Sequence, residues 1–237
     1  MTERLYMDNA ALMTCSARVV SATAESIELD RTIFYARSGG QAGDSGTLRW
    51  PGGETAIADT LKGDGEAIRH IPAAGAALPP IGAEVTCALD EARRHALMRM
   101  HTTLHLLCAV LPGVAVTGGA VNADKSRLDF DLANPPAKED VEAALNALIA
   151  ADHPVSTEWV DEAVLDTNPG LVRTLSVQPP RGTGRLRLVR IGDGATPIDL
   201  QPCGGTHVAR TGLIGRMTIV KIENKGKQNR RMVIAPA

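Results

Sequence analysis

The sequence predicts an α+β protein, in which a small N-terminal β-barrel domain (residues 1–89) precedes an α+β domain (residues 90–237). The first part carries short alternating runs of apolar and polar residues, separated by evenly spaced glycine and proline turn signals. This pattern is typical of a small barrel. The second part mixes two amphipathic helical patterns with strand patterns that do not alternate as β-α-β units, and it is therefore predicted to be α+β.

The composition is that of a soluble globular protein, with 44% hydrophobic and 22% charged residues in a chain of 237. Aromatic residues make up only 3%. The core is therefore predicted to be aliphatic, and the aromatic platforms that stack single-stranded bases are not expected. The net charge is −2, so any contact with nucleic acid must come from a local basic patch.

The cysteines and the N-terminus indicate a cellular compartment. The four cysteines have no paired spacing, which predicts a reducing environment. The polar start carries no secretory signal, and no apolar run approaches the length of a membrane span. We therefore expect a cytoplasmic protein without a membrane partner. The cysteines are Cys15, Cys87, Cys108 and Cys203.

The elements of the N-terminal part follow from alternation and turn signals. Residues 26–30 alternate cleanly and residues 17–22 loosely, residues 32–35 form a short apolar run, and residues 82–89 are predicted to be the last strand. A helix is then predicted from residue 91 to about residue 111. Asp90 can cap its start, and Pro112 with Gly113 is a typical stop.

Further along, an amphipathic helix is predicted over residues 138–151, with Val141, Leu145 and Leu148 as its apolar stripe. Gly118 and Gly119 are predicted to form a bend. Strands are predicted at residues 126–132, 155–160, 186–191, 214–223 and 231–234.

Two short motifs carry candidate metal ligands. His101 and His105 are four residues apart in the first predicted helix, so both imidazoles lie on one face. Cys203 and His207 are also four apart, and the glycines between them allow a turn that brings both side chains onto one ion. Three imidazoles and a thiolate suit Zn²⁺. The alternative for the helical pair is two buried histidines without a metal. His95 lies off the ligand face and is predicted to be on the surface.

The donor count leaves two kinds of zinc site open. Four protein ligands make a closed, structural site, whereas three ligands and a water make a catalytic one. The segment from His101 to His105 contains no glutamate, so the general base of a His-Glu-x-x-His metalloprotease is missing.

The letters around these residues resemble a known family. HTTLHLL, CGGTHV and the stretch Gly-Gly-Gln-x-x-Asp-x-Gly at residues 39–46 resemble the editing module shared by alanyl- and threonyl-tRNA synthetases and by free-standing alanyl-tRNA editing proteins. The resemblance covers nearly the whole chain and implies a zinc site at His101, His105, Cys203 and His207. The sequence departs from the family at Ala36 and Ala42, where proline is common, so we expect a looser loop.

The resemblance also implies an activity. Members of this family hydrolyse the ester that joins a wrongly attached amino acid to tRNA, on seryl-tRNA(Ala) and often glycyl-tRNA(Ala). A chain of 237 residues cannot hold a class II aminoacylation core, so we expect it to act in trans on the acceptor end of mischarged tRNA(Ala). Zinc is the expected cofactor, and no nucleotide cofactor is expected.

Selectivity for serine over the smaller alanine requires a polar partner for the serine hydroxyl, because alanine then leaves that buried partner unpaired. The candidate catalytic residues are Gln41, Asp44 and Thr103, with Thr102 and Thr206 as secondary candidates. For the threonines the alternative is a hydroxyl bonded to the backbone, and for residues 39–46 a plain hairpin turn.

Basic residues near the C-terminus are candidates for tRNA phosphate contacts, although a solvated hairpin tip is the alternative. They are Lys221, Lys225, Lys227, Arg230 and Arg231. A second basic stretch holds Arg181, Arg185, Arg187 and Arg190.

Three other functions fit the same residues. The first is a zinc hydrolase that acts on another ester or amide, and the second is a zinc-stabilised RNA-binding module without catalysis. The third is a threonyl-type editing module, against which the stretch at residues 39–46 argues.

Overall fold

The computed structural model describes residues 1–175, 178–179 and 181–237. The chain forms two compact units, Met1–Ala96 and Leu97–Ala237. The boundary between them falls within the long helix α1 (Glu91–Val110), seven residues after the predicted boundary between residues 89 and 90. Each unit is described separately below.

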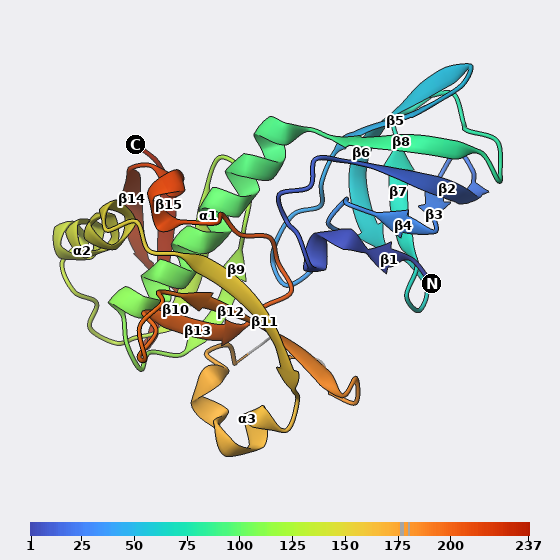
Figure 1. Cartoon of the computed structure of the whole chain (residues 1–237). Coiled ribbons are helices and arrows are strands. Elements are labelled where there is room, and N and C mark those ends of the chain that lie inside the picture. Colours follow the sequence, from blue (N-terminus) through green and yellow to red (C-terminus); the bar gives the residue numbers. More distant parts are fainter. Residues whose placement is uncertain (176–177, 180) are drawn as a thin grey trace. The chain divides into compact units, whose positions relative to one another are not determined.

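The first unit is a closed barrel, as the sequence predicts (Figure 1, blue to cyan strands). Its strands follow one another in the order β2-β3-β7-β6-β5-β8, and β8 pairs with β2 to close the barrel. All of these neighbouring strands are antiparallel. A short pair, β1 (Glu3–Arg4) with β4 (Arg31–Thr32), runs parallel. The barrel strands are β2 (Thr14–Ala22), β3 (Ile27–Leu29), β5 (Gly46–Trp50), β6 (Gly53–Lys62), β7 (Ile68–Pro72) and β8 (Glu84–Leu89).

Alternation places one side of each strand in an aliphatic core. On β2, Ala17 and Val19 are buried while Arg18 between them is exposed, which is the period-2 pattern of a strand with one buried face. The core has the aliphatic character that the low aromatic content predicts. Its buried members are Ala17, Val19, Ile27, Leu29, Ile33, Phe34, Leu48, Ile57, Val85, Cys87 and Leu89.

The predicted strand at residues 32–35 is only partly a strand, because regular pairing ends at Thr32. The residues that follow are buried, yet their backbone donors bond side chains in place of a neighbouring strand. The Phe34 N–H donates to the Thr32 hydroxyl at 3.0 Å, and the Tyr35 N–H donates to Asp44 Oδ2 at 2.7 Å. These side-chain acceptors satisfy buried backbone groups that a strand ladder would otherwise pair.

α1 begins and ends where the sequence predicts. Asp90 Oδ1 accepts the Arg93 N–H at 3.0 Å, which is a typical N-cap bond. The helix ends at Val110, and Gly113 follows with a φ of 76°, a left-handed conformation that glycine adopts readily. His95 is exposed, as predicted. No helix in the described part of the chain has both the length and the apolar composition of a membrane span.

The second unit contains two antiparallel sheets, the part of α1 from Leu97 onward and shorter helices (Figure 1). One sheet has the order β14-β15-β10-β9 and the other β11-β12-β13. The strands are β9 (Val116–Ala120), β10 (Ser126–Asp131), β11 (Val155–Asp161), β12 (Arg185–Ile191), β13 (Asp199–Pro202), β14 (Met217–Asn224) and β15 (Asn229–Pro236). The helices are α2 (Lys138–Ala150) and α3 (Val164–Thr167), with 3-10 turns at Leu5–Met7 in the first unit and at Pro169–Leu171 and Thr211–Ile214 in the second.

Three local predictions in this unit were wrong. Gly118 and Gly119 lie within strand β9, where a Cβ on Gly119 would come within 2.8 Å of Leu128 Cδ2 on β10, so a larger residue there would require the Leu128 side chain to move. The strand predicted from residue 214 begins only at Met217, after a 3-10 turn. In α2 the third fully buried apolar residue is Ile149 and not the half-buried Leu148.

A buried histidine in the barrel links stability to pH. His70 is fully buried between the Ile27 carbonyl, 2.9 Å from Nδ1, and the Thr32 hydroxyl, 2.7 Å from Nε2. Nδ1 donates to the carbonyl, and the hydroxyl donates to Nε2, so the ring is neutral. Burial, partly offset by the Ile27 carbonyl, lowers the pKa of His70 to about 4.

We expect acid to weaken the barrel through His70. Below pH 6.5 the unfolded chain takes up a proton at this histidine while the folded chain does not until about pH 4, so stability is lost as the pH falls through this window. The loss is on the order of 3 kcal/mol, at about 1.36 kcal/mol per pKa unit. Urea unfolding between pH 7 and pH 4, with metal chelated, should show a shallower pH dependence for His70→Gln than for the wild type. The exposed control His95→Gln should keep the wild-type slope, and equal slopes for all three proteins would contradict the expectation.

Candidate metal centre

Four side chains of the second unit meet at one point. His101 and His105 come from successive turns of α1, and Cys203 and His207 come from the segment that follows β13. Their ligand atoms all lie within 4.8 Å of one another. Cys203 Sγ is 3.6 Å from His101 Nε2 and 3.4 Å from His207 Nε2. The structure therefore brings together all four residues predicted as metal ligands.

Two edges of the donor group have the length expected for a tetrahedral metal site, although the four ligand atoms as a whole spread over up to 4.8 Å. Zinc–nitrogen and zinc–sulfur bonds of about 2.0–2.3 Å give a tetrahedron with edges of roughly 3.3–3.8 Å. The two measured sulfur–nitrogen separations, 3.6 and 3.4 Å, fall within this range. The three imidazoles are between 6% and 8% exposed, so the group is largely shielded from water. This arrangement could hold a divalent ion with borderline-soft character.

On α1, the spacing of four residues places His101 and His105 one above the other, and Thr102 between them orients a third ligand. The Thr102 hydroxyl donates to the Met98 carbonyl at 3.0 Å, so it can only accept from the His207 ring, whose Nδ1 lies 3.2 Å away. Nδ1 of His207 therefore carries the proton, and Nε2 is left to bind a metal.

The other two donors belong to a short turn, which we call the donor turn (residues 203–207). β13 leads directly into it, and Arg187 of the neighbouring strand β12 fixes its shape. Arg187 Nη1 donates to the Cys203 carbonyl at 2.7 Å and to the Gly205 carbonyl at 3.0 Å. The Gly205 N–H in turn lies 3.4 Å from Cys203 Sγ, where it stabilises a thiolate.

Electrostatics prepare this thiolate for metal binding. Burial opposes the charged form, but the adjacent imidazoles of His101 and His207 outweigh burial and hold the pKa of Cys203 well below its usual value. Burial and the neighbouring His101 lower the pKa of His207 to about 3, so this ring stays neutral. A thiolate and a neutral imidazole are the protonation states that metal coordination requires.

His105 has a different partner. Its Nδ1 lies 2.7 Å from Asp199 Oδ2, and Asp199 is itself 2% exposed. Burial lowers the pKa of His105, but the Asp199 carboxylate and the Cys203 thiolate outweigh burial and raise it to about 10. The ring therefore carries a proton on each nitrogen, and one of them must leave before the ring can bind a metal.

Two family models match parts of the chain. The model described as the second additional domain of threonyl and alanyl tRNA synthetases matches residues 186–233, and the model of class II (A) tRNA synthetases matches residues 9–93. The first match contains Cys203 and His207, whereas His101 and His105 lie between the two matched segments. Neither model alone covers the whole donor group.

Alignments with complete relatives cover nearly the whole chain and therefore extend over α1, most of which the two family models leave out. The alanyl-tRNA editing protein AlaX-M of Methanosarcina acetivorans is 35% identical, over 98% of this chain and 98% of that protein. The chain belongs to the family of alanyl-tRNA editing proteins. The AlaX-M protein of Methanosarcina mazei is 34% identical, over 98% of this chain and 95% of that protein. The chain is also 32% identical to the alanine–tRNA ligase of Pyrobaculum arsenaticum, but it spans only 25% of that protein's length.

The threonines predicted near the metal are buried, and the hydroxyls of Thr102 and Thr103 donate to the helix backbone. The Thr103 hydroxyl donates to the Arg99 carbonyl at 2.7 Å. This backbone bond is the alternative predicted from the sequence for the threonines. Thr102 combines both roles, because its hydroxyl bonds the helix backbone and also meets a metal-ligand candidate. Thr206, within the donor turn, is fully buried.

The other two predicted catalytic residues, Gln41 and Asp44, lie in the first unit and are almost completely buried. The backbone of Gln41 pairs with that of Ser38 in a tight turn, with N–H to carbonyl distances of 2.9 and 3.2 Å. Asp44 Oδ2 accepts Arg94 Nε at 3.0 Å, and Arg94 is fully buried. Asp44 thus forms a buried ion pair that anchors this loop of the editing protein to the start of α1.

The basic residues predicted to bind tRNA lie on β14, β15 and the turn between them, and three of them are already in ion pairs. Glu223 pairs with Lys221 at 2.6 Å and with Lys225 at 3.6 Å. Arg231 donates to both oxygens of Asp129, at 2.7 and 2.8 Å. These pairs reduce the charge that Lys221, Lys225 and Arg231 can offer to a phosphate.

The remaining two basic residues are at the hairpin tip. Arg230 donates to backbone carbonyls, including those of Gly226 at 3.1 Å and Ala133. Lys227 is exposed, and no ion pair of its ammonium occurs within the described ranges. Lys227 is therefore the residue at this tip whose charge is directed to solvent.

The second basic stretch is largely used within the protein. Arg181 pairs with Asp166 at 3.0 Å, and Arg185 lies 5.4 Å from the centre of the Trp159 ring. Arg190 donates to backbone carbonyls of the loop after β12. The fourth arginine of the stretch holds the donor turn, as described above.

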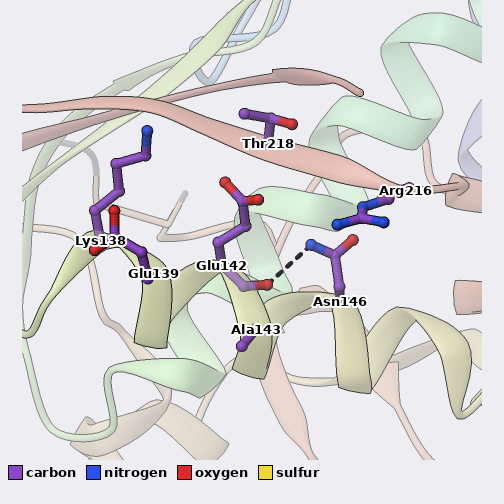
Figure 2. A pocket seen from close by; sticks show the side chains of 7 residues that line it. All are labelled: Lys138, Glu139, Glu142, Ala143, Asn146, Arg216 and Thr218. Atoms are coloured by element: carbon purple, nitrogen blue, oxygen red, sulfur yellow. Dashed lines mark hydrogen bonds between the residues drawn. The ribbon is translucent and has the colours of Figure 1, made fainter.

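A surface hollow of about 390 Å³ lies between α2 and β14 (Figure 2). The Asn146 side chain bonds the backbone of Met217 twice, at 2.8 and 3.0 Å, and Glu142 Oε2 accepts the Ile219 N–H at 2.8 Å. These bonds attach the helix to the strand, so we assign the hollow a structural role. It is lined by Lys138, Glu139, Glu142, Ala143, Asn146, Arg216 and Thr218.

Sequence reasoning missed the residues that support the donors. β13 was not predicted, and with it Asp199 and Gln201 were overlooked. The signal was present, since two polar residues alternate with apolar ones immediately before the CGGTH motif. Arg187 was assigned to a basic stretch, although a single arginine between apolar strand residues also indicates a buried role.

We expect protein purified without added metal to contain one divalent ion per chain. Cys203→Ala removes the thiolate. It should lower metal affinity by more than the roughly 10–100-fold lost when a residue that hydrogen-bonds to a metal ligand is removed. His95→Ala, on the exposed side of α1, should retain metal like the wild type. Elemental analysis after dialysis against a chelator measures both. Equal retention by Cys203→Ala and the wild type would show that the ion is held elsewhere.

Proposed function

We propose that this chain is a zinc-dependent aminoacyl-tRNA deacylase that acts in trans on mischarged tRNA(Ala) and removes serine. The observation that carries the proposal is the meeting of three imidazoles and one thiolate in a member of the alanyl-tRNA editing family. The reaction is hydrolysis of the carboxylic ester between the amino acid and the terminal ribose of tRNA. Glycine is the second amino acid that the enzyme is proposed to remove.

The donor group has a defined part in this reaction. His101, His105, Cys203 and His207 would hold the zinc ion. Bound zinc polarises an ester carbonyl or lowers the pKa of a coordinated water to about 7. The chain supplies the required protonation state at two of the four donors, because the thiolate of Cys203 and the neutral ring of His207 are stabilised by their surroundings, whereas His105 must first lose a proton.

Discrimination against alanine is proposed to depend on buried polar groups. Alanine is smaller than serine and cannot be excluded by size, so the site must penalise the missing hydroxyl. Gln41 is our first candidate, since it is a fully buried polar side chain in the loop that resembles the editing motif of the family. Thr103 is the second, because its hydroxyl donates to the backbone and keeps a lone pair with which to accept.

A second function is favoured by the number of donors. Four protein ligands around one ion are typical of structural zinc sites, whereas catalytic sites usually keep one position for water. A zinc-stabilised RNA-binding module without hydrolysis is therefore the competing proposal. The two differ in whether purified protein releases serine from tRNA.

The deciding experiment is deacylation of tRNA(Ala) charged with serine, glycine or alanine. We expect serine to be released fastest, glycine also to be released, and alanine to be spared. Gln41→Ala should keep the metal content of the wild type and slow serine release by roughly 10-fold or more, because about 1–3 kcal/mol is lost with a buried hydrogen-bond partner. The exposed variant His95→Ala is the matched control.

The outcomes separate the proposals. No release of serine by metal-loaded wild type would favour the binding module, and release from small esters alone would indicate a different hydrolase. Serine release by Gln41→Ala at the wild-type rate would leave the loop a structural role and move the search for the serine partner to Thr103.

For tRNA binding, we expect Lys227→Ala to weaken affinity without changing the chemical step. Each phosphate contact that is lost should reduce the slope of log affinity against log salt by roughly 0.7–0.9. Affinity for tRNA(Ala) is measured against salt for the wild type, Lys225→Ala, Lys227→Ala and Arg230→Ala, with exposed Lys62→Ala as control. Lys227 should show the largest effect, since Lys225 is paired with Glu223. A common slope for all five proteins would identify the hairpin as a solvated tip.

A further inference from the structure

Strand β13 carries two buried polar side chains next to His105 of the donor group. Asp199 is 2% exposed and Gln201 is 7% exposed. Because they are two residues apart on a strand, their side chains lie on the same face. Pairing of β13 with β12 aligns Asp199 with Ile191 and Gln201 with Val189, so both positions are fixed by backbone hydrogen bonds.

The hydrogen bonds of Asp199 define the orientation of His105. Asp199 Oδ2 lies 2.7 Å from His105 Nδ1, and a carboxylate can only accept, so Nδ1 carries the proton. Gln201 Nε2 lies 2.8 Å from Oδ1 and 3.0 Å from Oδ2 of the same carboxylate. The amide therefore holds the carboxylate, the carboxylate holds the imidazole, and Nε2 of His105 is directed to the other donors.

Asp199 also balances charge. A divalent ion bound to one thiolate and three neutral imidazoles would carry a net charge of +1 in a largely buried site. Such a charge is costly unless it is paired. The buried Asp199 carboxylate, bonded to His105 Nδ1, would bring the total to zero.

The comparison with His207 shows that the imidazoles are not equivalent. His207 Nδ1 meets a neutral hydroxyl of Thr102 at 3.2 Å, whereas His105 Nδ1 meets a charged carboxylate at 2.7 Å. Hydrogen bonds to a charged acceptor are shorter and roughly twice as strong as neutral ones. His105 is thus held more firmly than His207, and its ring faces a negative charge.

We propose that Asp199, held by Gln201, is a positioning residue that directs His105 Nε2 to a bound divalent ion and neutralises the charge of the loaded site. The proposal rests on the zinc dependence proposed above. The ligand is a borderline-soft divalent cation such as Zn²⁺, and Asp199 acts on it through His105 without coordinating it.

The test is a Zn²⁺ affinity measurement by competition with a chromophoric chelator, without tRNA. Asp199→Asn keeps the shape and an acceptor oxygen but removes the charge, and we expect it to weaken Zn²⁺ binding by roughly 10–100-fold. Asp199→Ala should bind more weakly still. Gln201→Met leaves the carboxylate without its support, and we expect a smaller loss. Asp129→Asn, which removes a buried carboxylate that pairs with Arg231 away from the donors, should bind like the wild type.

A spectroscopic measurement separates positioning from a general loss of stability. The visible absorption of Co²⁺-substituted protein reports the geometry of the ligands, and we expect it to change in Asp199→Asn and Gln201→Met but not in Asp129→Asn. Wild-type affinity and spectra in both Asp199 variants would overturn the inference. A wild type that binds Zn²⁺ but does not deacylate tRNA would overturn the proposed enzyme and leave this inference intact, whereas a wild type that binds no Zn²⁺ would overturn both.

Discussion

The second unit is organised around one constraint, which is that four polar donors from two distant segments lie within 4.8 Å of one another. His101 and His105 are fixed by the rigid spacing of α1, while Cys203 and His207 come from a turn about a hundred residues later. Bringing them together places three imidazoles and a thiolate in a largely buried space, where each needs a partner. The surrounding structure supplies these partners through Thr102 and Asp199.

Each unit contains a buried carboxylate that is stabilised by a nitrogen base and by a further hydrogen-bond donor. In the barrel, Asp44 pairs with the fully buried Arg94 and also accepts the Tyr35 N–H. In the second unit, Asp199 pairs with His105 and accepts from Gln201. A buried ion pair that loses one member leaves an uncompensated charge and is strongly destabilising, so each carboxylate ties its segment to one arrangement.

Features that depend on local residue spacing could be predicted from the sequence. Features that depend on contacts between neighbouring strands could not. The donors could be found because helical spacing places His101 and His105 together and glycines permit the turn to His207. The barrel followed from short alternating runs. β13 was missed because four residues with two polar side chains resemble a loop, and only pairing with β12 shows that Asp199 is buried. Gly119 was taken for a bend because the approach of Leu128 from β10 cannot be seen in the sequence.

Arg187 holds two carbonyls of the donor turn through one guanidinium nitrogen, and this has a consequence for the rate of metal exchange. The turn owes its shape to protein–protein hydrogen bonds, so the thiolate and the imidazole are already arranged when an ion arrives. Capture of an ion would then require loss of a proton from His105 but little rearrangement of the turn, and preorganised ligands lose little conformational entropy on binding. Release, by contrast, must break several bonds while the turn stays in place. An ion held by such a turn would therefore leave only when several of its bonds break together.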